Sequence, residues 1–484
     1  MAPTPAELAE RFLDLSKSND WTKTPGTRDG MNSKWEKFYY PHESRPQGRW
    51  EGEIDELVVY GEIPSDISGT FYRIIIDPYM PPDERNGFVE GDGWPPTFGI
   101  YRNPYTNDPS TRYANDSTGN TNIIYWGGNV LALAERGLPW AIDPDTLETR
   151  RYDPFAGQVK ALTFTAHAKW DPKTNELVTW GYEAKGLLTT AVVAYNLSED
   201  GNASGVNWVH DGWITENWII LSGMPLVTAS DEELRAGSQH WKYCHEIPQM
   251  MIVSPRRPET PCCPGWKVGE FRQYAVEEPG LTVHCGAAWE DKHGMIQMES
   301  QWSDLNPFYF WNPPNTPPTP VEGKYVRWSI GPNQPTDSKI MPTKEYLPWW
   351  NEFPTVDDRF NTQRQNITFM VGANVLRDEP ALGLPPFNSG GQVAEPCFIP
   401  QPEVEGDGWL LFWTAREGAP RGEMILSDSN DFTKPVVVIQ MPFVLQGQLH
   451  GNWVPNPNPS TKLPRLTKPL KYVQPTAIGP LNTI

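Results

Sequence analysis

Short apolar segments recur along most of the chain, and each is bounded by glycine, asparagine, aspartate or proline. Each segment holds one or two runs of about 5 to 8 residues rich in Val, Ile, Tyr, Phe and Trp, which favours β-strands over helices. The clearest segments are 52–74, 122–135, 176–197, 211–223, 325–331, 366–374 and 408–432. The pattern therefore predicts a chain built mainly of strands joined by turns.

Helical periodicity is limited to the N-terminus, where Leu8, Phe12 and Leu15 are spaced as on one face of a helix. No repeat of about 33 or 40 residues aligns along the chain, so periodicity alone does not indicate a propeller. No change in composition along the chain marks a domain boundary. We therefore expect one all-β domain, and closed radial packing is one way for a sheet system of this size to avoid exposed edges. The expected parts of residues 1–484 are a helix and loop at 1–50, the strands at 51–457 and a tail at 458–484.

The composition supports this picture, because 40 glycines, 51 prolines and 22 tryptophans suit many short strands and turns. The net charge of −20 argues against a nucleic acid partner and disfavours a strongly anionic substrate. No run of about 18 apolar residues is present, so no membrane-spanning helix is predicted. The first residues lack the basic start and apolar stretch of a secretory signal, so we expect a cytoplasmic protein. Five cysteines without a C-x-x-C pair favour reduced thiols.

The candidate chemistry lies in the histidines, since no H-E-x-x-H, G-x-S-x-G, Walker or dinucleotide motif is present. Four of the eight histidines adjoin apolar, aromatic or small residues: His167, His210, His284 and His450. Small neighbours such as Gly286 would let several backbones approach one axis. We set aside the other four, His42, His240, His245 and His293, two of which lie in a polar loop segment.

These four histidine segments resemble the histidine motifs of the carotenoid cleavage oxygenase family, in particular its lignostilbene dioxygenase-like branch. Further matching segments run in order from residue 53 to residue 457: "GTFYRI", "EGDGW", "FGIYRNPYTNDPS", "IVSPRR", "NEFPTVDDRF", "AEPCFIP" and "LHGNWVP". The resemblance implies a seven-bladed β-propeller with a few helices and loops capping one face. It also implies Fe(II) on the propeller axis, bound by His167, His210, His284 and His450. Four neutral imidazoles suit Fe(II) and leave two of six positions open for O2 and for water or substrate.

The resemblance assigns roles to further residues. Carboxylates behind the histidines would fix the ring tautomers and offset the charge of the metal, and the matching positions are Glu135, Glu352 and Glu395. Thr121 would border an open iron position, and Tyr101 would contact a phenolic oxygen of the substrate. The implied reaction is oxygenative cleavage of the C=C bond of a phenylpropenoid or stilbenoid to aromatic, vanillin-like aldehydes. The partners are then a small aromatic alkene and O2.

The chain departs from the family pattern in two places. Ala134 stands where the branch carries a lysine that would stabilise a phenolate, which weakens the expected preference for stilbenes. After Trp94 only three residues, "PPT", precede "FGIYRN", whereas the family carries a longer segment with a β-hairpin. Two alternatives therefore stay open beside the aromatic alkene: a carotenoid or apocarotenoid substrate, and a propeller that serves as a scaffold after losing its activity.

Overall fold

The structure is a computed structural model, and part of the chain is described here. The described residues are 57–75, 119–135, 137–185, 192–197, 210–228, 230, 241–257, 265–267, 270–306, 323–348, 350–374, 379–380, 392–401, 404–415, 422–431, 435–441 and 448–455. Several predicted features lie outside them: the N-terminal helix, Tyr101, the segment after Trp94 and the tail from residue 458.

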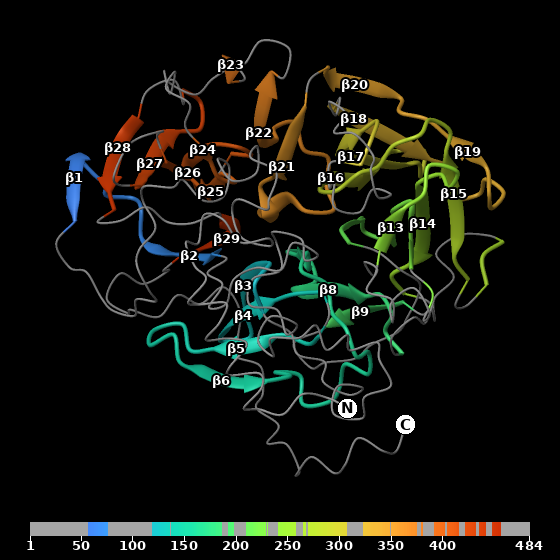
Figure 1. The fold of residues 1–484 in the computed structure, drawn as a ribbon, viewed down its shortest axis with the longest axis horizontal. Coiled ribbons are helices and arrows are strands. Elements are labelled where there is room, and N and C mark those ends of the chain that lie inside the picture. Colours follow the sequence, from blue (N-terminus) through green and yellow to red (C-terminus); the bar gives the residue numbers. More distant parts are fainter. Residues whose placement is uncertain are drawn as a thin grey trace, which may run out of the picture.

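Seven sheets follow one another around a common centre (Figure 1). We number them sheet 1 to sheet 7. Sheet 1 contains β3 (Asn122–Trp126), β4 (Asn129–Leu133), β5 (Trp140–Ile142) and β6 (Thr149–Tyr152). Sheet 2 contains β7 (Lys169–Asp171), β8 (Glu176–Gly181) and β9 (Val193–Leu197). Sheet 3 contains β10 (Gly212–Ile214), β11 (Trp218–Gly223), β14 (Met250–Pro255), β15 (Arg272–Val276) and β19 (Lys339–Ile340).

The remaining sheets complete the ring. Sheet 4 contains β16 (Cys285–Glu290), β17 (Ile296–Ser303), β18 (Gly323–Ile330) and β20 (Lys344–Leu347). Sheet 5 contains β21 (Asn351–Thr355), β22 (Phe369–Asn374) and β23 (Glu379–Pro380). Sheet 6 contains β1 (Val58–Gly61), β24 (Gln392–Val393), β25 (Cys397–Pro400), β26 (Gly408–Ala415), β27 (Gly422–Asp428) and β28 (Pro435–Gln440). Sheet 7 pairs β2 (Gly69–Ile75) with β29 (Gln448–Pro455), and a separate ribbon pairs β12 (Leu226–Thr228) with β13 (Trp241–Tyr243).

Strands that follow one another in the chain are antiparallel neighbours in most of these sheets. Strand β19 differs from the others in that it joins its neighbour, β15, in parallel, with Ala275 opposite Lys339. One strand of each of several neighbouring sheets lies beside a strand of the next sheet near the centre: β10 contacts β16, β16 contacts β21, β25 contacts β29 and β29 contacts β3. Radial packing of antiparallel sheets is the architecture of a β-propeller, so the predicted fold class is confirmed.

Strands from the two ends of the described chain close the ring. In sheet 7, Phe71 is opposite Trp453 and Arg73 is opposite Gly451. In sheet 6, β1 adds a further strand next to β28, with Val59 opposite Ile439. The N-terminal and C-terminal strands therefore share two sheets (Figure 1).

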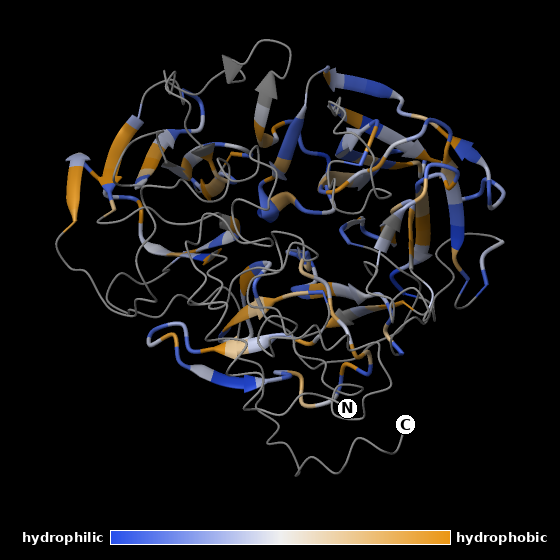
Figure 2. Cartoon of the chain, viewed as in Figure 1, coloured by the Kyte–Doolittle hydropathy of each residue, from blue (hydrophilic) through white to orange (hydrophobic). Residues whose placement is uncertain are grey.

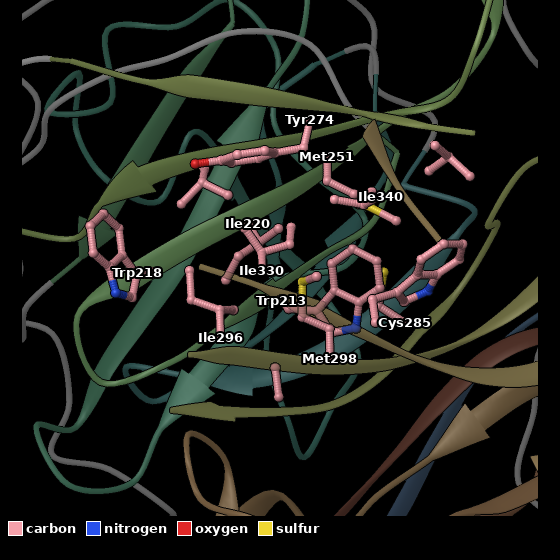
Figure 3. Close-up of a cluster of buried hydrophobic side chains, with 14 of the residues drawn as sticks. Trp213, Trp218, Ile220, Met251, Tyr274, Cys285, Ile296, Met298, Ile330 and Ile340 are labelled. Atoms are coloured by element: carbon pink, nitrogen blue, oxygen red, sulfur yellow. The ribbon is translucent and has the colours of Figure 1, made fainter. Parts of the chain in front are cut away.

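The core lies between the sheets. Outer strands such as β6 and β20 are hydrophilic and partly exposed, whereas β4 and β11 are buried along their whole length (Figure 2). The largest apolar cluster joins sheet 3 to sheet 4, with Trp213, Ile220 and Met251 on one side and Met298 and Ile330 on the other (Figure 3). Burial of such side chains stabilises the fold by roughly 25 cal/mol per Å² of apolar surface.

Helices contribute little to the described part of the chain. Its one helical element is the 3-10 turn η2 (Asp358–Phe360), so the expected capping helices are not found among these residues. Among them, too, no helix has the length and apolar character needed to span a bilayer. The described cysteines Cys244, Cys285 and Cys397 are free thiols, as predicted, and Cys262 and Cys263 lie outside.

Candidate metal centre

The four predicted histidines come together at the centre of the ring. His167 precedes β7 by two residues, His210 precedes β10 by two residues, and His284 directly precedes β16. His450 lies within β29. Each histidine therefore occupies or precedes a strand at the inner edge of its sheet, next to the centre of the ring (Figure 1).

The distances between the rings show how closely they approach. The ring centroid of His167 is 4.6 Å from that of His210, 5.0 Å from that of His284 and 4.7 Å from that of His450. The centroids of His284 and His450 are 4.9 Å apart. One potential ligand atom from each of His167, His210 and His284 lies within 4.8 Å of the others, which is close enough for one metal ion to be shared.

Three of the histidines pair through Nδ1 with a glutamate. His284 Nδ1 lies 2.6 Å from Glu352 Oε2, and His450 Nδ1 lies 2.8 Å from Glu395 Oε1. His210 Nδ1 pairs with Glu135 Oε1. A carboxylate at Nδ1 accepts the proton of a neutral imidazole there, so the Nε2 lone pair is left available for a metal. The three predicted glutamates thus meet three different histidines.

His167 has a different environment. It is 6% exposed, and its backbone N–H donates to Thr165 Oγ1 at 2.9 Å. Its Nε2 is buried and has no hydrogen-bond partner in the described part of the chain. A buried polar atom without a partner is costly, and a metal ion at the meeting point of the rings would satisfy this one. The residues present therefore fit a divalent metal with imidazole ligands.

The electrostatics also suit a metal ligand at His167. Burial, together with the other three histidines, holds the pKa of His167 well below its ordinary value. His167 is therefore neutral near pH 7, the state that a metal ion needs. Burial by itself would also lower the pKa of His210. The Glu135 carboxylate more than offsets this effect, so the pKa of His210 is raised.

A further set of groups holds the carboxylates. The Tyr182 hydroxyl donates to Glu135 Oε2 at 2.7 Å, the Phe353 N–H donates to Glu352 Oε2 at 2.9 Å, and the Gly451 N–H donates to Glu395 Oε2 at 3.1 Å. These hydrogen bonds restrict each carboxylate to one orientation. The motifs "NEFPTVDDRF" and "LHGNWVP" include Phe353 and Gly451, but nothing in the sequence marked these two residues or Tyr182 as partners of the glutamates.

Thr121 lies next to this centre. It directly precedes β3 of sheet 1, and its carbonyl oxygen accepts the His450 N–H at 3.4 Å. Together with the four histidines, Glu352 of sheet 5 and Glu395 of sheet 6, it completes a simple pattern. Each of the seven sheets supplies one of these predicted residues, and each lies in or just before a strand near the centre. Glu135 is the exception, because it follows β4, a second strand of sheet 1.

The structure describes only some of the remaining histidines and expected substrate residues. His245 and His293, which we set aside, are exposed, and His42 and His240 lie outside the described residues. Ala134 is 6% exposed, next to Glu135. Tyr101 lies outside the described residues, so its predicted contact with substrate is not tested.

Phe353 is a residue of the centre that the sequence did not reveal. Its ring centroid is 5.2 Å from that of His284 and 5.4 Å from that of His450. Its backbone φ is 54°, a left-handed conformation that is rare for an aromatic residue and that costs free energy. Proline follows it in "NEFP", but no local sequence rule predicts positive φ at this phenylalanine.

Comparison with known proteins identifies relatives of the chain. The family model of RPE65, retinal pigment epithelial membrane protein, matches residues 92–455. Resveratrol cleavage oxygenase 1 of Botryotinia fuckeliana (strain B05.10) is 38% identical, over 88% of this chain and 87% of that protein. Isoeugenol monooxygenase of Pseudomonas nitroreducens is 32% identical, over 84% of this chain and 96% of that protein.

A solved structure is similar as well. The crystal structure of Pseudomonas brassicacearum lignostilbene dioxygenase superposes with a TM-score of 0.75 and 28% identity, covering 90% of this chain and 100% of that chain. These relatives are named as oxygenases, and they match the chain over most of its length. The chain therefore belongs to the RPE65 family, which comprises the carotenoid cleavage oxygenases that its motifs resemble.

Proposed function

We propose that this protein is a non-haem iron(II) dioxygenase that cleaves the alkene C=C bond of a phenylpropenoid or stilbenoid with O2. The bond between the two alkene carbons breaks and each carbon gains one oxygen atom, so R–CH=CH–R′ and O2 give R–CHO and R′–CHO. The observation that carries the proposal is the set of four converging histidines, three of them paired with glutamates. The names of the relatives, which refer to resveratrol, isoeugenol and lignostilbene, support an aromatic alkene as substrate.

The proposed iron ligands are the Nε2 atoms of His167, His210, His284 and His450. Bound iron would supply the site at which O2 is activated for reaction with the alkene. The chain itself orients the imidazoles, since Glu135, Glu352 and Glu395 engage Nδ1 of their partners and leave Nε2 available for the metal. These three carboxylates also offset the charge of a divalent ion in a largely buried place.

The substrate would lie beside this centre. The Phe353 ring next to His284 and His450 offers an apolar surface for a planar aromatic molecule. Tyr101 would hydrogen-bond the phenolic oxygen of the substrate. Because Ala134 cannot supply a cation there, we expect the phenol to react in its neutral form more than in a lysine-containing relative.

The first experiment is reconstitution with Fe(II) under argon, followed by O2 with resveratrol, isoeugenol, 4-vinylguaiacol or an apocarotenal. We expect iron-dependent aldehydes from at least one aromatic alkene, and with ¹⁸O2 the label should enter both carbonyl products after rapid quenching. Aldehyde from the apocarotenal alone would favour the carotenoid alternative. A protein that binds no iron would favour the scaffold alternative and would overturn the proposal.

The ligand assignment has a matched test within the chain. His284→Ala should lose bound iron and activity, because it removes one imidazole from the centre. His293→Ala is the control, since His293 is an exposed histidine nine positions further along the chain. Full iron and full activity in His284→Ala would show that the proposed ligand set is wrong.

A further inference from the structure

Asp211 is a buried carboxylate that the proposed reaction does not use. It follows His210 directly and is 1% exposed. Its Oδ1 atom lies 2.9 Å from Lys169 Nζ and accepts the Gly212 N–H at 2.7 Å. Its Oδ2 atom accepts the Cys285 N–H at 2.7 Å.

The partners of Asp211 belong to three consecutive sheets. Lys169 starts β7 of sheet 2, Gly212 starts β10 of sheet 3, and Cys285 starts β16 of sheet 4. Each partner lies one or two positions after a histidine of the candidate metal centre: Lys169 after His167, Gly212 after His210 and Cys285 after His284. The contacts to Gly212 and Cys285 are made to backbone N–H groups, so they locate the main chain itself.

From this arrangement we infer that Asp211 is a positioning residue that sets the spacing of His167, His210 and His284, with Lys169 as its counter-ion. The inference rests on the proposed metal site and deepens it. The three glutamates orient individual rings, whereas Asp211 fixes three backbone segments relative to one another. A metal ion needs its ligand atoms at defined distances, so the spacing of the segments affects affinity as well as ring orientation.

A second buried ion pair in the same region provides the control. Asp171 of β7 accepts from Arg256 Nη1 at 2.7 Å, and both side chains are almost fully buried. Arg256 also donates to the Thr215 carbonyl at 2.9 Å, so this pair likewise joins sheet 2 to sheet 3. Asp171 and Thr215 lie four and five positions after His167 and His210, further from the histidines than the partners of Asp211. Loss of either pair should reduce stability, but only loss of the Asp211 pair should change metal binding.

The test uses Co(II), whose visible d–d absorption reports both affinity and ligand geometry. The full-length apo protein is titrated as wild type, Asp211→Asn, Lys169→Met, the double variant and Asp171→Asn, and the Tm of each apo protein is measured. We expect Asp211→Asn and Lys169→Met each to weaken Co(II) binding by roughly 10-fold or more and to shift the d–d bands. Asp171→Asn should lower the Tm yet keep the wild-type affinity and spectrum.

Lys169→Met separates positioning from a simple charge effect. If Asp211 acted only through its negative charge, removal of the nearby Lys169 cation would tighten Co(II) binding. The inference predicts the opposite, because Oδ1 of the carboxylate loses one of its two partners. The double variant has no unpaired buried charge, so we expect its Tm to recover while its affinity stays low.

Two results would overturn the inference. One is wild-type affinity and spectrum in both single variants, and the other is tighter Co(II) binding by Lys169→Met. If Asp211→Asn alone does not fold, the double variant decides by the same two readouts. A wild-type protein that binds no Co(II) and no Fe(II) would instead overturn the proposed function, so the two failures are distinguishable.

Discussion

One oxygen of Glu352 accepts two hydrogen bonds at the candidate metal centre. Oε2 accepts from His284 Nδ1 at 2.6 Å and from the Phe353 N–H at 2.9 Å. A single atom thus links the orientation of an imidazole to a backbone segment with positive φ. The chemistry of the centre therefore depends on the charge of this carboxylate as well as on its position.

Glu352→Gln should weaken metal binding by roughly 10- to 100-fold, because an amide is a poorer acceptor for the imidazole and offsets none of the metal charge. The measurement is a Co(II) or Fe(II) titration under argon. Glu345→Gln is the control, since Glu345 forms an ion pair with Lys324 in which both side chains are well exposed, at 42% and 38%. Equal metal affinity in the two variants would contradict the role of Glu352.

The positive φ of Phe353 can be tested with two substitutions, to glycine and to alanine, which both remove the ring and differ in how well they tolerate this backbone conformation. Glycine adopts φ of 54° without steric cost, whereas alanine does not. We therefore expect Phe353→Gly to be more stable than Phe353→Ala by about 1 kcal/mol in urea unfolding. This order is the reverse of the usual one in strands, so an alanine variant of equal or greater stability would argue against a left-handed backbone here.

At the scale of the element, the pairing of β2 with β29 joins the two ends of the described chain and also carries His450. Gly69 is opposite Pro455 at one end of this pairing, and a Cβ atom at Gly69 would lie 2.5 Å from Trp453 Cζ2 and from the Val454 carbonyl oxygen. β2 and β29 can therefore approach this closely only because Gly69 has no side chain. A disturbance of this pairing would affect both the closure of the ring and the position of one proposed iron ligand.

Gly69→Ala should lower the free energy of unfolding by roughly 1 to 3 kcal/mol, because the added methyl group forces β2 away from β29. Thermal unfolding of the apo protein measures this effect. Gly331→Ala is the control, since a Cβ atom at Gly331 would meet its nearest neighbours, Gln334 and Met295, at 3.4 Å. A Gly69→Ala protein with the Tm of the control would show that the strands can separate at no cost.

At the scale of the whole molecule, the proposed ligands belong to sheets 2, 3, 4 and 7 of the ring. An ion bound at the centre would therefore link four sheets directly, in addition to the packing and the Asp211 contacts between them. Because the ligands converge only in the folded ring, binding should favour the folded state over the unfolded chain.

Metal removal should accordingly lower the thermal stability of the entire protein. At a free metal concentration about 100 times the dissociation constant, the expected stabilisation is about 2.7 kcal/mol. The measurement is the Tm of the chelator-treated protein as Co(II) is added, which should rise continuously with concentration. A Tm that does not respond while spectroscopy reports bound metal would show that the unfolded chain binds the ion equally well.

The sequence by itself determined the all-β class, and it predicted the four histidines and three glutamates that the proposed site contains. Strand-forming segments are a local property, because the alternation of apolar residues and the turn residues act over a few positions. The histidines and glutamates stand in short motifs whose order resembles one family, so they too could be read without coordinates. The predicted helix, Tyr101 and the short segment after Trp94 stay predictions, since they lie outside the described residues.

Only the tertiary structure decided which groups meet. Glu135 and His210 are 75 positions apart, Glu352 and His284 are 68 apart, and Glu395 and His450 are 55 apart. Asp211 likewise reaches Cys285 across 74 positions, and no local pattern distinguishes it from a solvated aspartate. Each pairing depends on how the sheets are placed around the axis, and that placement comes from packing between sheets rather than from the residues near each group.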